Sequence, residues 1–364
     1  MSSATPASQN PRPPHPRASI AKAKELNALQ DLDTLLAGAG LVRSRREKPA
    51  GVKQRARFQD KAPEELRPRP ALTTQAANGV EFVGVPALQK LHWLWHGFST
   101  RRGGVSRAYA PEGAPGELNL GFTPQDERDN VLRNRLLLAQ AITGDPDTPV
   151  VNLRQIHSNV LVHTQSENDR PACKGDGLIT DRPGLLLAIQ TADCIPVLVA
   201  DRKRRVVAAF HAGWRGTVKR IVETGIGRMR VQFGSRPQDL VAAIGPGIGP
   251  CCYAVGEEVL AEFESQFSYA RELFHEVCNT DPVRTKYPML FLTQRAPGHS
   301  PMDPSLHLDL VEANRRQLIA AGLKPRSISA VGGCTSCQPE MFFSHRASRG
   351  HCGRMMSVIG IRGI

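Results

Sequence analysis

The sequence predicts an α/β protein, because short apolar runs and amphipathic stretches alternate along the chain from about Phe82 onward. Three of the apolar runs are five or six residues long and are bounded by polar or turn-forming residues: 185–189, 195–200 and 206–210. Runs of this length and setting are typical of buried β-strands. We therefore expect these three segments to form the centre of a sheet.

The amphipathic stretches supply the expected helices. They cover residues 127–141, 218–233 and 308–321, and their apolar residues recur in part at spacings of three and four. No internal repeat is evident. A length of 364 residues allows one large or two ordinary domains with a substantial buried core.

Composition excludes several protein classes. No apolar run approaches the roughly 18 residues needed to cross a bilayer, and the mean hydropathy is −0.30 with 22% charged residues. The eight cysteines are scattered along a long chain without the apolar segment of a signal peptide. We therefore expect no membrane partner, a reducing compartment and a cytoplasmic location.

Residues 1–80 are expected to be a disordered basic extension, and residues 81–364 the folded domain. The extension carries a net charge of +7, from 14 Lys/Arg and 7 Asp/Glu, out of +13 for the whole chain. It is rich in proline, has few aromatics, and contains one predicted helix at 21–36. The absence of acids before Glu25 leaves an organellar transit peptide as an alternative. No motif supports nucleic-acid binding.

A second irregular segment spans residues 279–304, which are rich in proline and turn-forming residues. Such composition is typical of a loop. We interpret it as an insertion that forms a surface loop or a lid over the pocket.

Three residues form a candidate metal triad. His157 ends the sequence RQIH, Cys194 ends TADC, and His211 begins HAGWRGT. Two imidazoles and a thiolate suit Zn²⁺, and three protein ligands leave a fourth position open for a reactive water. The separations along the chain match no zinc-finger pattern. From spacing alone, each of these residues could equally be an ordinary core residue.

Several motifs together resemble the laccase-domain family, also called the YfiH or multicopper polyphenol oxidase-like family, whose members are purine nucleoside phosphorylases. The resemblance covers about residues 95–359, and TADC in register with HAGWRGT is its most specific part. The other matching motifs are GFSTRRGGVS at 97–106, NLGF at 119–122, DGLIT at 176–180, GPGIGPCCYAVG at 245–256 and FFSHR with GR between 342 and 354.

The resemblance implies a single compact domain of mixed β-sheets with outer helices, similar to the fold of cytotoxic necrotizing factor toxins. It also implies that His157, Cys194 and His211 bind zinc. The implied activity is phosphorolysis of adenosine, guanosine, inosine and S-methyl-5′-thioadenosine, together with adenosine deamination. The implied partners are purine nucleosides and inorganic phosphate, with the chain a monomer or a homodimer. Copper is less expected, because the chain lacks the His-x-His pairs of a true laccase.

Further residues are expected to serve the reaction. Arg101 matches an arginine of the family and lies beside two glycines that let backbone amides approach an anion. We assign Arg101 a catalytic and phosphate-binding role, and Arg215 and Arg354 a substrate- or phosphate-binding role. Asp193 is the acid nearest to Cys194 in sequence and is the candidate proton carrier. Trp214 is interpreted as a core residue rather than as a base-stacking one.

Two other functions remain open. A metal-free cysteine hydrolase or deamidase would use Cys194 as its nucleophile and a histidine as its base, as the toxins of similar fold do. A non-enzymatic scaffold would instead act through the basic extension. The metal content of the purified protein distinguishes the cysteine hydrolase or deamidase from the zinc enzyme.

The remaining cysteines are interpreted as structural thiols. Cys334 and Cys337 form a lone CxxC without the second CxxC of a four-cysteine site. Cys251 and Cys252 are adjacent, so we expect their side chains to point apart and to pack rather than to chelate. Ser158 departs from the family, which commonly has glycine there.

Overall fold

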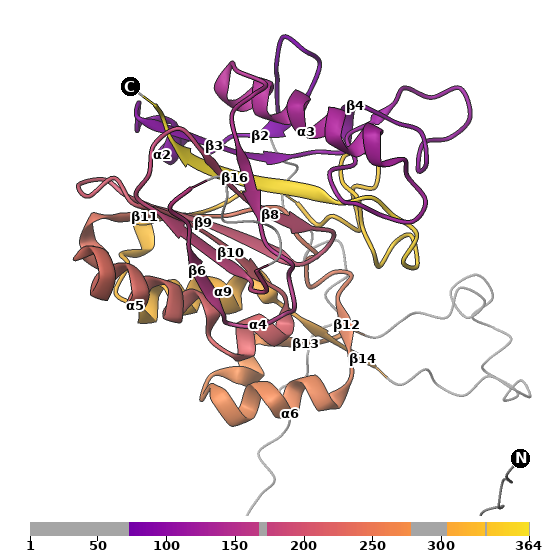
Figure 1. Ribbon diagram of the computed structural model, residues 1–364. Coiled ribbons are helices and arrows are strands. Elements are labelled where there is room, and N and C mark those ends of the chain that lie inside the picture. The colour runs from indigo at the N-terminus through magenta and orange to yellow at the C-terminus, as the bar shows by residue number, and fades with distance from the viewer. Residues whose placement is uncertain (1–72, 167–172, 278–303, 332, 364) are drawn as a thin grey trace, which may run out of the picture. The chain divides into compact units, whose positions relative to one another are not determined.

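Two six-stranded sheets face each other in the computed structural model, which describes residues 73–166, 173–277, 304–331 and 333–363 (Figure 1). The first sheet has the order β1 (Thr73–Gln75), β2 (Glu81–Val83), β3 (Leu94–Ser99), β16 (Met355–Ile361), β8 (Leu186–Thr191) and β5 (Val150–Asn152). The second has the order β15 (Ile328–Ala330), β11 (Leu240–Ile244), β9 (Ile195–Asp201), β10 (Val207–Ala212), β7 (Gly177–Thr180) and β6 (Leu161–His163).

Most neighbouring strands are antiparallel, but three pairs are parallel: β5 with β8, β6 with β7, and β11 with β15. A smaller sheet has the order β12 (Ala254–Val255), β14 (Ser305–Leu308) and β13 (Phe274–Val277). The strand β4 (Arg102–Ser106) follows β3 along the chain.

The central strands β8, β9 and β10 are buried on both faces, so their sequences are apolar except towards their C-terminal ends. In β9, Val197 and Val199 belong to one hydrophobic cluster, whereas Leu198 and Ala200 belong to another. The second cluster also contains Leu187 of β8, and therefore fills the space between the two sheets. This alternation follows from the two-residue period of a strand.

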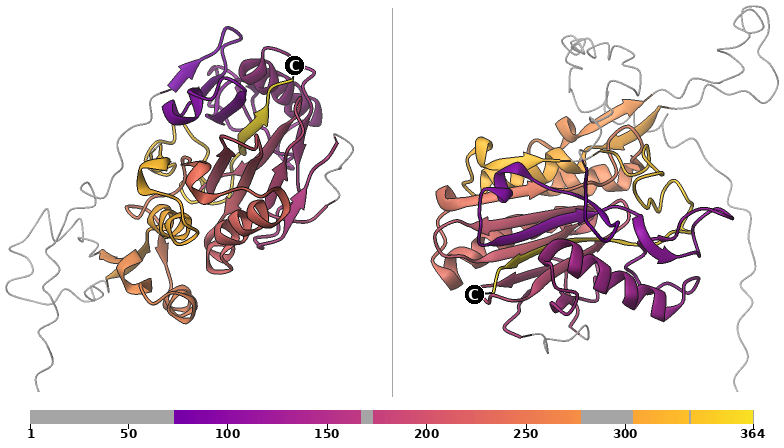
Figure 2. Two further views of the ribbon diagram at one scale, coloured as in Figure 1. Left: turned by 90° about the vertical axis from the view of Figure 1, so that its left-hand side faces the viewer. Right: turned by 90° about the horizontal axis from the view of Figure 1, so that it is seen from above.

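Helices cover the outer faces of both sheets, which gives four layers (Figure 1 and Figure 2). The helix α3 (Arg128–Thr143) packs on the first sheet, where Leu138 meets Leu186 and Met356. On the second sheet lie α4 (Trp214–Val218), α5 (Ile221–Phe233) and α9 (Leu310–Ala320), which share one cluster with α6 (Glu257–Gln266). The short α2 (Pro86–Gln89) precedes β3.

Local sequence fixes where α9 begins. The Asp309 side chain accepts a hydrogen bond from the backbone amide of Glu312 at 2.9 Å, which satisfies one of the free amides of the first turn. Single-turn 3₁₀ helices occur at Pro237–Asp239, Ala270–Leu273 and Pro325–Ser327.

The structure confirms the predicted α/β class. The three expected strands correspond to β8, β9 and β10, and the three expected helices to α3, α5 and α9. The described fold starts at β1, so residues 73–80 belong to it. The rest of the predicted extension, its helix at 21–36, and nearly all of the predicted insertion at 279–304 lie outside the described residues. Within the described ranges, no helix is both long and apolar enough to span a membrane.

Candidate metal and substrate site

The site lies where β9 begins and β10 ends. These strands are antiparallel, with Ile195 opposite Ala212 and Pro196 opposite His211. Cys194, one residue before β9, therefore comes next to Gly213, one residue after β10. The antiparallel register thus brings together two residues that are 19 positions apart in the sequence.

His157 completes the group from the loop that follows β5. The ligand atoms of His157, Cys194 and His211 all lie within 4.8 Å of one another. Cys194 Sγ is 4.0 Å from His157 Nε2, and the two imidazole rings are 4.9 Å apart at 72°. His211 is buried, Cys194 is half-buried and His157 is exposed. The structure therefore brings the three sequence-predicted residues together, with one side open to solvent.

Asp176, directly before β7, organises both histidines. Its carboxylate accepts hydrogen bonds from His211 Nδ1 at 2.8 Å and from the backbone amide of His157 at 3.0 Å. It also accepts two bonds of 2.6 Å from the amide and hydroxyl of Ser158. Because Nδ1 of His211 faces Asp176, Nε2 is left for a metal. The departure from the family at Ser158 therefore adds a bond to this carboxylate.

The network sets the charge of Asp176. Burial alone raises the pKa of a carboxyl group, but the hydrogen bonds from His211 and Ser158 hold the pKa of Asp176 well below its usual range. Asp176 is therefore a fully buried carboxylate that stays ionised and supports positive charge at His211.

Opposite charges also meet at Cys194 and His211. Burial raises the pKa of Cys194, but the nearby His211, and then His157, lower it to about 6. Burial lowers the pKa of His211, but Cys194 and Asp176 raise it to about 9. Without a metal, the two residues therefore form a thiolate–imidazolium pair at neutral pH. Metal binding would displace the imidazolium proton.

Two residues at the site have left-handed backbones, which non-glycine residues rarely adopt. His157 has φ of 57° and Asp193 has φ of 92°. Each such residue costs on the order of 1–3 kcal/mol, and persists where the surrounding structure holds it in place. Here the amide of His157 is held by Asp176, and the carbonyl of Asp193 by the amide of Ile248 at 2.8 Å. These hydrogen bonds therefore hold the strained backbone at His157 and next to Cys194.

The residues present fit a zinc ion. The donor set of two imidazoles and one thiolate matches zinc in catalytic sites. Gly213 adds a second observation, because a Cβ atom at this position would lie 2.9 Å from Cys194 Sγ and 3.1 Å from His157 Cδ2. A side chain at residue 213 would thus fill the space beside the donor atoms, and glycine keeps it clear.

The triad opens into a cavity of about 720 Å³, large enough for a nucleoside. Four arginines line it: Arg154, Arg215, Arg346 and Arg354. The Arg215 guanidinium lies 4.3 Å above the Trp214 ring, which packs against the core and also lines this cavity. The predicted residues Arg215 and Arg354 are therefore at the triad, and the cavity can hold an anion.

Arg101 lies elsewhere. It lines a neighbouring cavity with Tyr109 and Phe343, and its guanidinium forms an ion pair of 2.6 Å with Glu117. The same group stacks on Phe343, with 4.6 Å from Cζ to the ring centroid. The structure does not bring Arg101 together with the triad, and Glu117 already matches its charge.

Asp193 lines the cavity of the triad, but both carboxylate oxygens have partners. Oδ1 accepts a bond of 2.6 Å from Thr335 Oγ1, and Oδ2 a bond of 2.7 Å from the amide of Arg346. These contacts hold the backbone next to Cys194. They favour a positioning role for Asp193 over proton transfer.

Sequence reasoning missed Asp176, Tyr253, Arg154 and Arg346. Burial, and then the negative charge of Cys194, raises the pKa of Tyr253, so its phenol keeps its proton beside the triad. Asp176, Arg154 and Tyr253 each belong to a recognised motif, namely DGLIT, RQIH and GPGIGPCCYAVG. Their position in those motifs was the available signal.

The four cysteines are free, as expected, but the expectation that Cys251 and Cys252 point apart was wrong. The Sγ atoms of Cys251 and Cys252 both approach Cys337, at 3.5 and 3.3 Å, and the Cys334 thiol joins them. Residues 250–252 form a turn rather than a strand, and a turn can place two adjacent side chains on one side.

Comparisons with known proteins identify the family of this chain. A family model described as multi-copper polyphenol oxidoreductase laccase matches residues 95–362. A protein from Bacteroides thetaiotaomicron named purine nucleoside phosphorylase is 33% identical over 286 residues, which cover 77% of this chain and 96% of that protein. A protein from an unknown prokaryote, named adenosine deaminase RL5, is 33% identical over 72% of this chain and 92% of its own length.

A solved structure shows the same fold. The crystal structure of YlmD from Geobacillus stearothermophilus matches with a TM-score of 0.63 and 33% identity, covering 81% of this chain and 100% of that one.

Proposed function

Because this chain belongs to the multi-copper polyphenol oxidoreductase laccase family, whose relatives include named purine nucleoside phosphorylases and an adenosine deaminase, we propose that it is a zinc-dependent purine nucleoside phosphorylase with adenosine deaminase activity. The proposed substrates are adenosine, guanosine, inosine and S-methyl-5′-thioadenosine, with inorganic phosphate as cosubstrate. The observation that supports this most is the His157, Cys194 and His211 triad, open to a cavity lined by arginines.

Each part of the cavity has a proposed role. His157, Cys194 and His211 would hold Zn²⁺, which supplies Lewis-acid chemistry and lowers the pKa of a water molecule toward about 7. Asp176 fixes the tautomer of His211. These residues give the site its nucleophile-activating capacity, which deamination of adenosine requires.

Phosphorolysis needs an anion site beside the nucleoside. Arg215 and Arg354 are proposed to bind phosphate, because guanidinium groups match its geometry and both line the cavity of the triad. Tyr253, which keeps its proton, is proposed to donate a hydrogen bond to the substrate. Arg101 is left out of this set, since Glu117 neutralises it in another cavity. Asp193 is proposed to position Cys194.

The decisive experiment incubates the protein with adenosine, with and without phosphate, and measures adenine, ribose 1-phosphate, inosine and hypoxanthine. We expect adenine and ribose 1-phosphate to form only when phosphate is present. Inosine should form even when phosphate is absent. His157→Ala should abolish both reactions, whereas His92→Ala, at another exposed histidine, should abolish neither. Absence of all four products from the wild-type protein would reject the proposal.

One observation favours a second candidate function. The lowered pKa of Cys194 and its imidazolium neighbour resemble the nucleophile pair of a cysteine hydrolase or deamidase. That alternative predicts a purified protein without stoichiometric metal at the triad, and activity that survives a chelator but not alkylation of Cys194. The zinc enzyme predicts loss of activity with the chelator and its return when zinc is added.

A further inference from the structure

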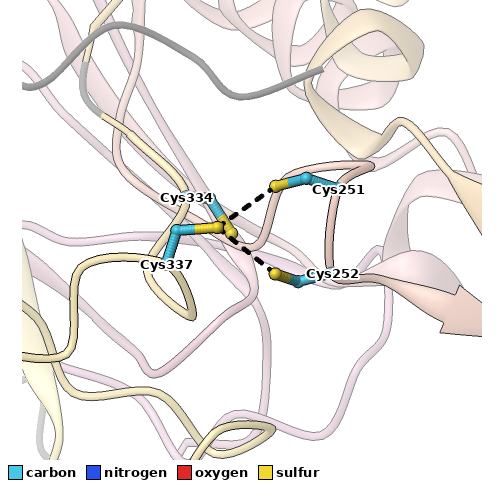
Figure 3. A group of neighbouring side chains, drawn as sticks. All are labelled: Cys251, Cys252, Cys334 and Cys337. Atoms are coloured by element: carbon cyan, nitrogen blue, oxygen red, sulfur yellow. Dashed lines mark hydrogen bonds between the residues drawn. The ribbon is translucent and has the colours of Figure 1, made fainter. Parts of the chain in front are cut away.

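Outside the proposed active site, four cysteine side chains converge on one point (Figure 3). Cys251 and Cys252 come from the turn between β11 and β12, and Cys334 and Cys337 from the segment between β15 and β16. We propose that Cys251, Cys252, Cys334 and Cys337 bind a structural zinc ion. This inference is independent of the proposed catalytic function.

Strand pairing explains why segments more than 80 residues apart meet. The strands β11 and β15 are parallel, with Ile244 opposite Ala330, so the segments that follow them leave the sheet at the same end. Beyond the strands the pairing resumes, because the amide of Thr335 donates to the carbonyl of Gly247 at 3.0 Å. Each of these two segments then presents two cysteines to the other.

The spacing of the sulfur atoms suits a tetrahedral metal. All four Sγ atoms lie within 4.8 Å of one another, and Cys337 Sγ is 3.5 Å from Cys251 Sγ and 3.3 Å from Cys252 Sγ. Four thiolates around zinc, each at ~2.3 Å, would be ~3.8 Å apart. A disulfide requires ~2.0 Å, and all four cysteines are free. The arrangement is therefore close to that of a tetrathiolate site.

The surroundings of Cys334 also support a bound metal. Its side chain is fully buried, and its Sγ accepts a hydrogen bond from the amide of Gly249 at 3.2 Å. Amide donors to sulfur are a common feature of the shell around metal thiolates. Gly249 also packs closely against the cluster, since a Cβ atom there would lie 3.2 Å from Cys334 Cβ and 3.3 Å from Cys251 Sγ.

Four protein ligands complete the coordination of zinc and leave no position for substrate, so the role is structural. The site would tie the end of β11 to the segment after β15. That segment carries Thr335, whose hydroxyl holds Asp193 beside Cys194. A metal at the four cysteines would therefore also stabilise the loop that positions a catalytic ligand.

Metal analysis of the purified full-length protein tests the proposal. We expect about two zinc ions per chain in the wild type, and about one in the variant His157→Ala with Cys194→Ser, whose four-cysteine site is intact. Cobalt substitution of that variant should give the intense thiolate-to-metal charge-transfer bands of a tetrathiolate site. Cys334→Ser with Cys337→Ser should retain about one zinc and show a lower melting temperature than the wild type.

Three outcomes would overturn the inference. The first is a folded active-site variant that holds no zinc, and the second is iron in place of zinc at the four cysteines. The third is a disulfide among these four thiols, detected by peptide mapping of the unreduced variant that lacks Cys194. Should the Cys334 and Cys337 variant fail to fold, the metal content and cobalt spectrum of the active-site variant still decide the question. Nucleoside turnover has no part in these measurements, so failure of the proposed function would be recognised separately.

Discussion

The carboxylate of Asp176 joins the two histidines of the site, because it bonds to His211 through Nδ1 and to His157 through the backbone amide. One buried charge thus orients a ligand on β10 and a ligand in the loop after β5. The position of Asp176 immediately before β7, which pairs with β10, makes this contact a direct result of sheet order.

Replacing Asp176 should weaken the site without changing a ligand. In Asp176→Asn the amide can no longer accept every bond that the carboxylate accepts, and the charge that supports His211 is lost. We expect zinc affinity and nucleoside turnover to fall by ~10–100-fold. Competition with a chromophoric chelator measures the affinity. Asp181→Asn, at an exposed carboxylate after β7, is the control, and equal loss in both variants would contradict the role of Asp176.

Gly213 should be required for metal binding rather than for the fold. Its backbone, at φ −68° and ψ 168°, suits any residue, so the effect of Gly213→Ala must come from the added Cβ beside Cys194 Sγ. We expect the zinc content to fall well below that of the wild type, with a folded circular dichroism spectrum.

A matched glycine controls for this change. Gly227 lies in α5, and a Cβ atom there would meet nothing within 4 Å. Gly227→Ala should keep its zinc and gain up to ~1 kcal/mol in the free energy of unfolding, because alanine favours a helix. Normal zinc content in Gly213→Ala would refute the steric argument.

Arg215 should contribute to phosphate binding. A charged hydrogen bond contributes ~1.5–3 kcal/mol, so Arg215→Ala should raise KM for phosphate by at least ~10-fold, with a smaller effect on KM for the nucleoside. Steady-state kinetics at varied phosphate gives both values. Arg230→Ala removes the same charge from the exposed face of α5 and should leave KM for phosphate unchanged. A rise confined to the KM for the nucleoside would instead place Arg215 at the base or ribose.

Stability should depend on pH through His96 in β3. Burial lowers the pKa of His96 from 6.5 to about 4, and its Nε2 accepts the amide of Val85 at 3.0 Å. Between these two values the unfolded chain binds a proton that the folded chain does not. The contribution of neutral His96 to the free energy of unfolding is therefore present above pH 6.5. It is lost as the pH falls toward 4, by up to ~3 kcal/mol.

Denaturant unfolding at several pH values checks this effect. His96→Gln can still accept the amide of Val85 but does not titrate, so its free energy of unfolding should fall less steeply between pH 6.5 and 4. Parallel curves for the wild type and this variant would show that His96 does not account for the slope.

The sequence by itself determined the α/β class, the strands β8, β9 and β10, and the identity of His157, Cys194 and His211 as a group. Apolar runs of strand length and helical spacings of three and four are local properties, so they can be found without the fold. The triad came from the resemblance of these motifs to the laccase-domain family, since spacing alone left each of the three residues open to an ordinary core role.

Only the tertiary structure decided which of the remaining polar residues meet. Arg101 and Arg215 are both arginines in strong motifs, but Glu117 neutralises one and the other lines the cavity of the triad. Asp176 and the four cysteines acquire their partners from sheet order and from the parallel β11–β15 pair, which join residues far apart in the chain. Such contacts depend on which strands become neighbours and on the direction in which each strand leaves its sheet, and the pattern within a single segment specifies neither.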